Sequence, residues 1–276
     1  MAINLALKYA DKIEEAFVLE SLVFGKGKAT YAFTGVSQVK SLTPTTVSLA
    51  TYDISETSAP RFGSLVEMQD TVNTYTISQD KAFNIAIDRG NNERQLNLKE
   101  AGRMLKMEVD EQVIPTLDKY ALGAYAAVSG ATTVSSVTLT KSNIVDQYAD
   151  AIKTLVNNKV PATGLISWIG ATAFSKLVCS PEFLNLEKLG EKAVGKGVIG
   201  EVQGVQIIRV PDSYMPTNTD FIVTHPSILM PVKKINTLRI LKEHPDVDGN
   251  VLQGRFMYDA FVLHQKENGV YVCKNA

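Results

Sequence analysis

The feature that most constrains the fold is a stretch, residues 51–81, that has the residue types of strands but cannot build a core. Its second half alternates polar and β-forming residues from Val72 to Ile77, and its first half is rich in polar and turn-forming residues such as Pro60 and Gly63. Such a stretch gains too little burial on its own to offset the entropy cost of ordering it. We therefore predict an extended loop or hairpin that leaves a larger body.

A long helix is predicted over residues 97–128, where apolar side chains recur at three- and four-residue steps. They are Leu98, Leu105, Val109, Val113, Leu117 and Tyr120. At 1.5 Å per residue this helix would extend roughly 45 Å. Pro115 lies inside the pattern, where it removes one backbone hydrogen bond and crowds the preceding turn, so a kink or break is expected near Val113.

The rest of the chain mixes helix and strand patterns, so the fold class is α+β. Residues 129–140 are small and polar and form the best internal boundary. A second amphipathic helix is predicted over 141–157. Beyond it, strands and one short helix are expected at 164–169, 172–179, 205–210, 221–223, 238–241, 255–264 and 270–273.

The first part of the chain is predicted to be a helical arm. Leu5, Tyr9, Ile13 and Phe17 recur every fourth position, with charged residues between them, and a glycine-rich segment near Gly25 ends the pattern. A single short helix needs a partner surface for its apolar stripe. That surface could belong to the same chain or to a neighbour.

Composition and charge exclude several classes of function. The 276 residues are 45% hydrophobic and 21% charged, which is ordinary for a folded globular protein. The formal net charge is -1, so no basic field attracts phosphate, and the clusters Lys26–Lys28 and Lys233–Lys234 are too short for a groove that tracks nucleic acid. No apolar run approaches the ~20 residues that span a bilayer.

Two short motifs resemble ligand-binding loops but lack the required context. The string Gly195 to Gly200 fits G-x-G-x-x-G, yet an alternating strand pattern follows it where a dinucleotide site needs a helix N-terminus. We interpret it as a glycine loop. The segment Asp246 to Asn250 lacks the third acidic ligand and the final Glu of a calcium loop, so a hairpin turn is expected.

The histidines and cysteines also indicate structural roles. His225, His244 and His264 have no partner at metal-ligand spacing. Cys179 and Cys273 match no metal or redox spacing, so two buried or idle thiols in a reducing compartment are expected. We therefore predict no catalytic, cofactor-binding or metal-binding residue and no cofactor.

The order of these elements resembles that of the major capsid proteins of tailed bacteriophages. Thr76–Asp88 is similar to the segment that returns from their extended loop, and Val113–Tyr120 is similar to part of their spine helix. Gly200–Ile208 and Val251–Tyr271 resemble strands of their axial and C-terminal regions. The resemblance covers about residues 35–275, and the order of the segments carries it more than any one motif.

The resemblance implies the HK-ninety-seven-type shell fold, with an N-terminal arm, an extended loop, a peripheral domain and an axial domain. It implies this division of the chain: arm 1–33; peripheral domain 34–50 and 82–139, with the spine helix; extended loop 51–81; axial domain 140–235; returning peripheral strands 236–276. The implied protein is no enzyme. It assembles in the bacterial host cytoplasm into hexamers and pentamers of an icosahedral virion shell around double-stranded DNA, without sequence-specific DNA binding and without a membrane.

A chain that begins at its short arm also implies a separate scaffolding protein, beside a portal. Some relatives crosslink their subunits, but no matching lysine and asparagine pair was identified, so a non-covalent shell is expected. An encapsulin-like nanocompartment shell is the alternative function, and a nucleotide-binding α/β enzyme is a remote one. The residues expected at contacts between subunits are Leu5, Ile13, Phe17, Tyr52, Arg61, Phe62 and Tyr75.

Overall fold

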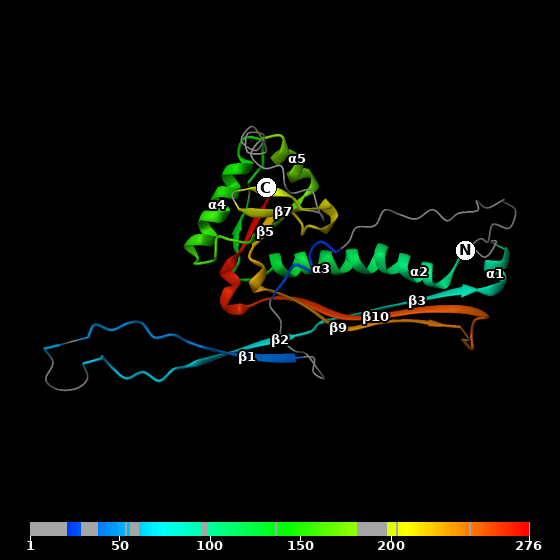
Figure 1. The fold of residues 1–276 in the computed structure, drawn as a ribbon, viewed down its shortest axis with the longest axis horizontal. Coiled ribbons are helices and arrows are strands. Elements are labelled where there is room, and N and C mark those ends of the chain that lie inside the picture. The colour runs from blue at the N-terminus through cyan, green and yellow to red at the C-terminus, as the bar shows by residue number, and fades with distance from the viewer. Residues whose placement is uncertain are drawn as a thin grey trace. The chain divides into compact units, whose positions relative to one another are not determined.

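The computed structural model describes residues 21–28, 38–52, 54–55, 61–94, 99–135, 137–180, 198–202, 204–242 and 244–275. The chain divides into two compact units. The body contains Met1–Thr30 and Ser78–Ala276, and the hairpin unit contains Tyr31–Ile77. Figure 1 shows the elements of both units.

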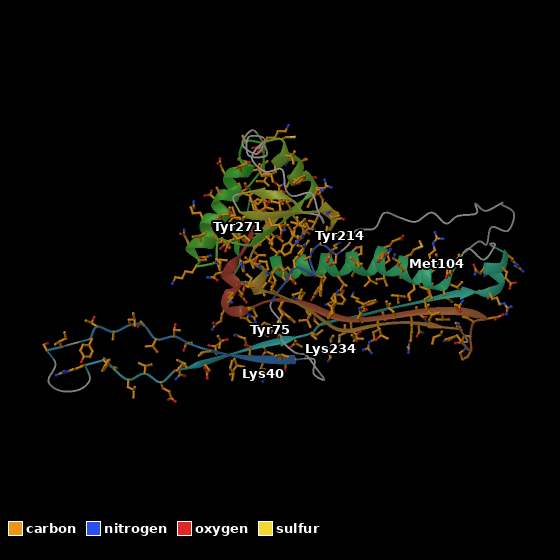
Figure 2. All side chains as sticks on the ribbon, in the orientation of Figure 1. Lys40, Tyr75, Met104, Tyr214, Lys234 and Tyr271 are labelled. Atoms are coloured by element: carbon orange, nitrogen blue, oxygen red, sulfur yellow. The ribbon has the colours of Figure 1, made fainter. Side chains whose placement is uncertain are left out.

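A three-stranded antiparallel sheet and a long helix form one part of the body. The sheet has the order β3-β10-β9, formed by Gln79–Asp88, Gly249–Val262 and Leu229–Leu241. A short helix α1 (Arg89–Arg94) follows β3, and α2 (Ala101–Glu108) comes next in the described chain. Side chains fill the space between the long helix and this sheet (Figure 2).

The long helix continues past the proline instead of breaking there. A π-helical turn at Val109–Val113 joins α2 to α3 (Ile114–Ala126), and Pro115 lies in the first turn of α3. The kink or break expected near Val113 takes the form of this π-helical turn, which interrupts the α-helical pattern without ending the helix. The wider turn accommodates the missing proline N–H, because a π turn already departs from the i→i−4 ladder.

A six-stranded mixed sheet forms the other part of the body. Its order is β4-β11-β8-β5-β7-β6. The strands are Thr132–Val134, Val270–Lys274, Thr219–Thr224, Leu165–Gly170, Val205–Val210 and Val198–Val202. Helices α4 (Ile144–Asn157) and α5 (Ala171–Val178) pack against it (Figure 1).

Strand β5 is buried on both faces, as its continuous apolar run predicted. Ile166 and Trp168 belong to a core cluster shared with α3 and β10. Leu165 and Ile169 belong to a second cluster with α4 and α5. The six-stranded sheet, which we call the central sheet, therefore lies between the two core clusters of the body.

Three segments group differently from the expected division of the chain. Residues 38–44 form β1 (Gln38–Pro44), which pairs with β2 (Asp70–Thr76) in the hairpin unit and not with the peripheral strands. Strands β4 and β11 join the six-stranded sheet, although 82–139 and 236–276 were assigned to the peripheral domain. Strand pairing between distant segments decides these assignments, and a short strand such as β4 carries little signal of its partner.

Candidate assembly surfaces

The base of the hairpin unit is a regular two-stranded ladder. Strands β1 and β2 pair antiparallel, with Gln38 opposite Thr76 and Pro44 opposite Asp70. Beyond the last pair, the backbone N–H and the hydroxyl of Thr45 both donate to the carbonyl oxygen of Gln69, each at 2.8 Å. These bonds hold the two legs together after the ladder ends.

The hairpin unit exposes large apolar side chains to a degree that the body does not. Of the thirteen exposed large apolar side chains in the described part of the chain, ten lie in this unit. They are Leu42, Val47, Leu49, Tyr52, Ile54, Phe62, Leu65, Val66, Met68 and Val72. Figure 2 shows side chains standing out from both legs with no second layer of this unit behind them. Exposed apolar surface of this extent marks an interaction surface.

The distal legs of the hairpin unit pack against each other. The rings of Tyr52 and Phe62 meet edge to face, with centroids 4.9 Å apart. Gly63 has a φ of +82°, and a Cβ there would lie 2.9 Å from the Cβ of Ala50. Glycine is therefore required at position 63, both for the left-handed backbone and for the close approach of the legs.

A buried carboxylate holds the point where the chain returns from the hairpin unit to the body. Asp259 of β10 is 3% exposed and accepts four hydrogen bonds. Ser78 donates its N–H and its hydroxyl to Oδ2, at 2.8 and 2.9 Å, and Tyr120 of α3 donates to Oδ1 at 2.8 Å. Burial, and then the bond to Asp259, raise the pKa of Tyr120, so its hydroxyl remains a donor.

A second buried carboxylate holds the end of the N-terminal segment. Asp118 of α3 is fully buried and accepts bonds from the Ser21 hydroxyl at 2.8 Å and the Leu22 N–H at 2.7 Å. The indole Nε1 of Trp168 donates to the carbonyl oxygen of Leu22 at 3.1 Å. Phe24 is also buried in the core. Buried acids thus hold both Ser21–Leu22 and Ser78 to the body.

No family model matches this sequence, and no curated protein matches it. Solved structures do match it along nearly its whole length. A chain of the capsid of cyanophage P-SCSP1u has a TM-score of 0.74 at 15% identity, covering 99% of this chain and 94% of the other. This chain has the HK-ninety-seven-type shell fold.

Two further structures with the shell fold agree. A chain of the mature capsid of bacteriophage PhiM1 has a TM-score of 0.72 at 14% identity, over 99% of this chain and 92% of the other. A chain from Mycobacterium phage Che8 has a TM-score of 0.73 at 19% identity, over 99% and 98%. The α+β class and the capsid-type fold expected from the sequence are therefore confirmed.

A virus-like particle from Pyrococcus furiosus matches less well. Its TM-score is 0.51 at 13% identity, and the match covers 75% of this chain and 80% of the other. The shell fold thus extends to that particle, but the phage structures reproduce more of this chain.

The residues predicted to contact other subunits have different environments. Tyr52 and Phe62 are exposed on the distal legs, at 46% and 83%, and Arg61 is exposed beside them. Tyr75 lies in β2 and is buried. Leu5, Ile13 and Phe17, together with the predicted arm helix, lie outside the described residues.

Sequence reasoning missed the most exposed apolar residues of the hairpin unit. Leu49 and Leu65 are fully exposed, and Val66 and Met68 are also exposed. The sequence did contain a signal for them. These apolar residues lie within a stretch that is too polar to form a core of its own, so their burial has to come from another surface. Aromatic residues drew attention instead, because they dominate the energetics of interfaces.

The glycine string from Gly195 to Gly200 leads into a β-hairpin that is formed by β6 and β7. Residues 195–197 lie outside the described residues, and Gly200 is part of β6, which pairs antiparallel with β7. Strand β7 follows directly through Gly204, whose φ is +81°. The expected strand after the string is confirmed, and this arrangement offers no helix N-terminus to a phosphate.

The turn and histidine motifs stabilise local structure. His244 and Val247 form an isolated β-bridge, which closes the turn expected near Asp246. His225 Nδ1 accepts the N–H of Ser227 and caps a short helix. Within the described ranges, no group of three or more His, Cys, Asp or Glu residues could hold a metal ion.

The two thiols differ in exposure. Cys273 is buried, and burial raises its pKa to about 12, so it stays protonated and unreactive. Cys179 is exposed at the end of α5. Of the two thiols expected to be buried or idle, Cys273 is the buried one, and Cys179 is exposed because only one face of that short helix packs on the sheet. No helix in the described part of the chain is long and apolar enough to cross a membrane.

Proposed function

We propose that this protein is the major capsid protein of a tailed bacteriophage, a structural subunit that assembles with copies of itself into an icosahedral shell. The fold supports this, because the best-covered similar structures include phage capsids. The observation that carries the proposal is the hairpin unit. It exposes ten large apolar side chains and has no second layer of its own to cover them.

Burial on a neighbouring subunit is the physical reason to assemble. A paired ribbon with exposed apolar side chains gains free energy when it lies on another surface. Tyr52, Arg61 and Phe62 sit at the distal legs of the hairpin unit, and we include them in this contact together with Leu49 and Leu65. A shell subunit touches several neighbours at once, so modest contacts suffice for a stable particle.

The proposed role is structural and not enzymatic. We propose hexamers and pentamers of one chain, joined without covalent crosslinks and assembled in the host cytoplasm with a scaffolding protein and a portal. The arm residues Leu5, Ile13 and Phe17 are proposed to contribute to contacts between subunits. The net charge of -1 suits a container that encloses double-stranded DNA without gripping each phosphate.

Deleting residues 54–64 tests the role of the hairpin unit. None of the described residues of this stretch, 54–55 and 61–64, belongs to either core cluster, so the deleted chain should fold as a monomer with the thermal stability of the intact chain. It should form no shells when expressed with a scaffolding protein, as judged by electron microscopy. Normal shells from the deleted chain would reject the proposed contact.

An encapsulin-like nanocompartment shell is the second candidate, because the Pyrococcus furiosus virus-like particle shares part of the fold. Its lower coverage of this chain favours the phage shell. The contents of purified particles separate the two functions. Nuclease-protected double-stranded DNA of uniform length supports the phage capsid, whereas a single co-purifying cargo enzyme supports the nanocompartment.

A further inference from the structure

The body has an apolar groove beside its long helix. We call it the spine groove; it has a volume of about 190 Å³ and lies between the helix and edge strand β9. It is lined by Val109, Val113, Ile114, Leu117, Lys233, Ile235, Asn236, Leu238, Phe256 and Tyr258. Lys233 is the only charged residue in this lining, so the groove suits an apolar occupant.

The spine groove adjoins the largest uncovered apolar area of the described body. Leu238 lines the groove and is 41% exposed, and Ile240, two residues further along β9, is 38% exposed. Both side chains lie on the helix-facing side of the sheet, since Ile240 pairs with buried Leu252 and Leu238 pairs with Gly254. Among the described residues of the body, only Val156 is a further exposed large apolar side chain.

The N-terminal segment reaches the body at one end of this groove. The ring of Phe24 meets Tyr258 edge to face at 6.4 Å, and Lys233 Nζ lies 4.9 Å from the centroid of the same ring. Tyr258 and Lys233 both line the groove. Asp118, which holds Ser21, lies one helical turn beyond Ile114, another lining residue.

The length of chain before Ser21 fixes what can occupy the groove. Phe17 is joined to Ser21 through three residues, so it must lie within about 14 Å of that attachment point, at 3.3–3.6 Å per residue. A helix from Leu5 to Phe17 would be about 18 Å long. The strand from Lys233 to Ile240 is about 23 Å long, so a helix of that length fits alongside it.

We infer that in the unassembled subunit the apolar stripe Leu5, Tyr9, Ile13 and Phe17 docks in the spine groove of its own chain. The tether raises the effective concentration of the stripe at this groove far above that of a second copy. Docking covers Leu238 and Ile240 until neighbouring subunits are present. The inference goes beyond the proposed shell function; the release of the stripe by neighbouring subunits rests on that function, whereas docking in the monomer does not.

Hydrogen exchange on the full-length monomer tests the docking. Backbone amides of residues 5–17 should exchange about tenfold or more slowly in the native chain than in the double variant Leu238→Asp, Ile240→Asp. The control is Val156→Asp, which places the same charge on α4, away from the groove. This variant should retain the slow exchange. Free exchange of residues 5–17 in the native chain would overturn the inference, as would equal protection in the double variant.

Crosslinking separates the chain's own segment from that of a second copy. In a Cys179→Ser background, Ile13→Cys and Leu238→Cys are combined and oxidised in a mixture of isotopically light and heavy protein. Docking within one chain predicts disulfide-linked peptides of like isotopes only. Light–heavy peptides at the statistical frequency would show that a second copy fills the groove and would overturn the inference. The inference would also be overturned if no crosslink formed while a solvent-exposed control pair of cysteines was fully oxidised.

Discussion

The strands of the hairpin unit and of the central sheet in the body place their apolar side chains in opposite environments. Leu42 of β1 is 66% exposed, whereas Leu165 of β5 is 1% exposed. β5 has the sequence Leu-Ile-Ser-Trp-Ile-Gly and packs into one core cluster on each of its faces, whereas β1 has the sequence Gln-Val-Lys-Ser-Leu-Thr-Pro and alternates apolar with polar residues. The ladder of β1 and β2 has only its own two strands. Strands β1 and β5 therefore differ both in their share of apolar residues and in the layers that cover them.

This contrast distinguishes residues that stabilise the folded subunit from residues that contribute only to assembly. Substitutions in the covered sheet remove burial that the subunit itself gains on folding, so they should lower the free energy of unfolding. Substitutions on exposed hairpin positions remove burial that exists only after assembly. Four substitutions, taken from the largest to the smallest expected effect on the free energy of unfolding, test this separation.

Trp168→Ala should have the largest effect. Trp168 is fully buried, stacks on Tyr125 with centroids 6.0 Å apart, and donates to Leu22. Its removal leaves a large cavity and should lower the free energy of unfolding by about 3–5 kcal/mol. Urea denaturation followed by circular dichroism measures the change. Trp168→Phe, which retains most of the packing, should cost clearly less; an equal cost would mean that the indole N–H dominates.

Asp259→Ala should have the next largest effect. The change leaves the Ser78 N–H, the Tyr120 hydroxyl and the Ala260 N–H without their buried acceptor. The expected loss is about 2–3 kcal/mol, measured by the same denaturation. Ser78→Ala removes only one hydroxyl and should cost about 1 kcal/mol. If both variants unfold like the native chain, the carboxylate does not hold the return from the hairpin unit.

Asp80→Asn should have a smaller effect that depends on pH. Arg255 donates to the Asp80 carboxylate at 3.1 and 2.6 Å, and this bond lowers the pKa of Asp80 below its ordinary 3.8. The pair therefore stabilises the fold above about pH 3.8, and its contribution is lost as the pH falls through the lowered pKa. Thermal melts from pH 5 to pH 2 should show a shallower decline for the variant. Parallel curves would show that the ion pair of Asp80 and Arg255 does not contribute to the stability of the fold.

Phe62→Ser should have the smallest effect on unfolding and a large effect on assembly. Phe62 is 83% exposed and contacts only Tyr52 among the described rings. The free energy of unfolding should change by no more than about 0.5 kcal/mol, while shells seen by electron microscopy are lost. The matched control, Val156→Ser on α4 of the body, should leave both unchanged. Loss of shells in the control as well would show that exposed apolar residues in general, and not the hairpin unit, drive assembly.

The sequence predicted most of the helices and strands but fewer of the segments with which they pair or pack. A continuous apolar run located the strand that covers 165–170, and apolar residues at three- and four-residue steps located the long helix. Pro115 was expected to break that helix, and the π turn accommodates it. The predicted contact residues on the distal legs are exposed, whereas Tyr75 is buried.

By itself, the sequence determined that a long segment would be unable to bury itself, because this property depends only on local composition and spacing. Only the tertiary structure decided which segments lie together. It placed β4 beside β11, and it brought Ser78 and Tyr120 to Asp259. Such pairings depend on the complementarity of surfaces that are distant in the chain, and one sequence carries no local signal of that complementarity.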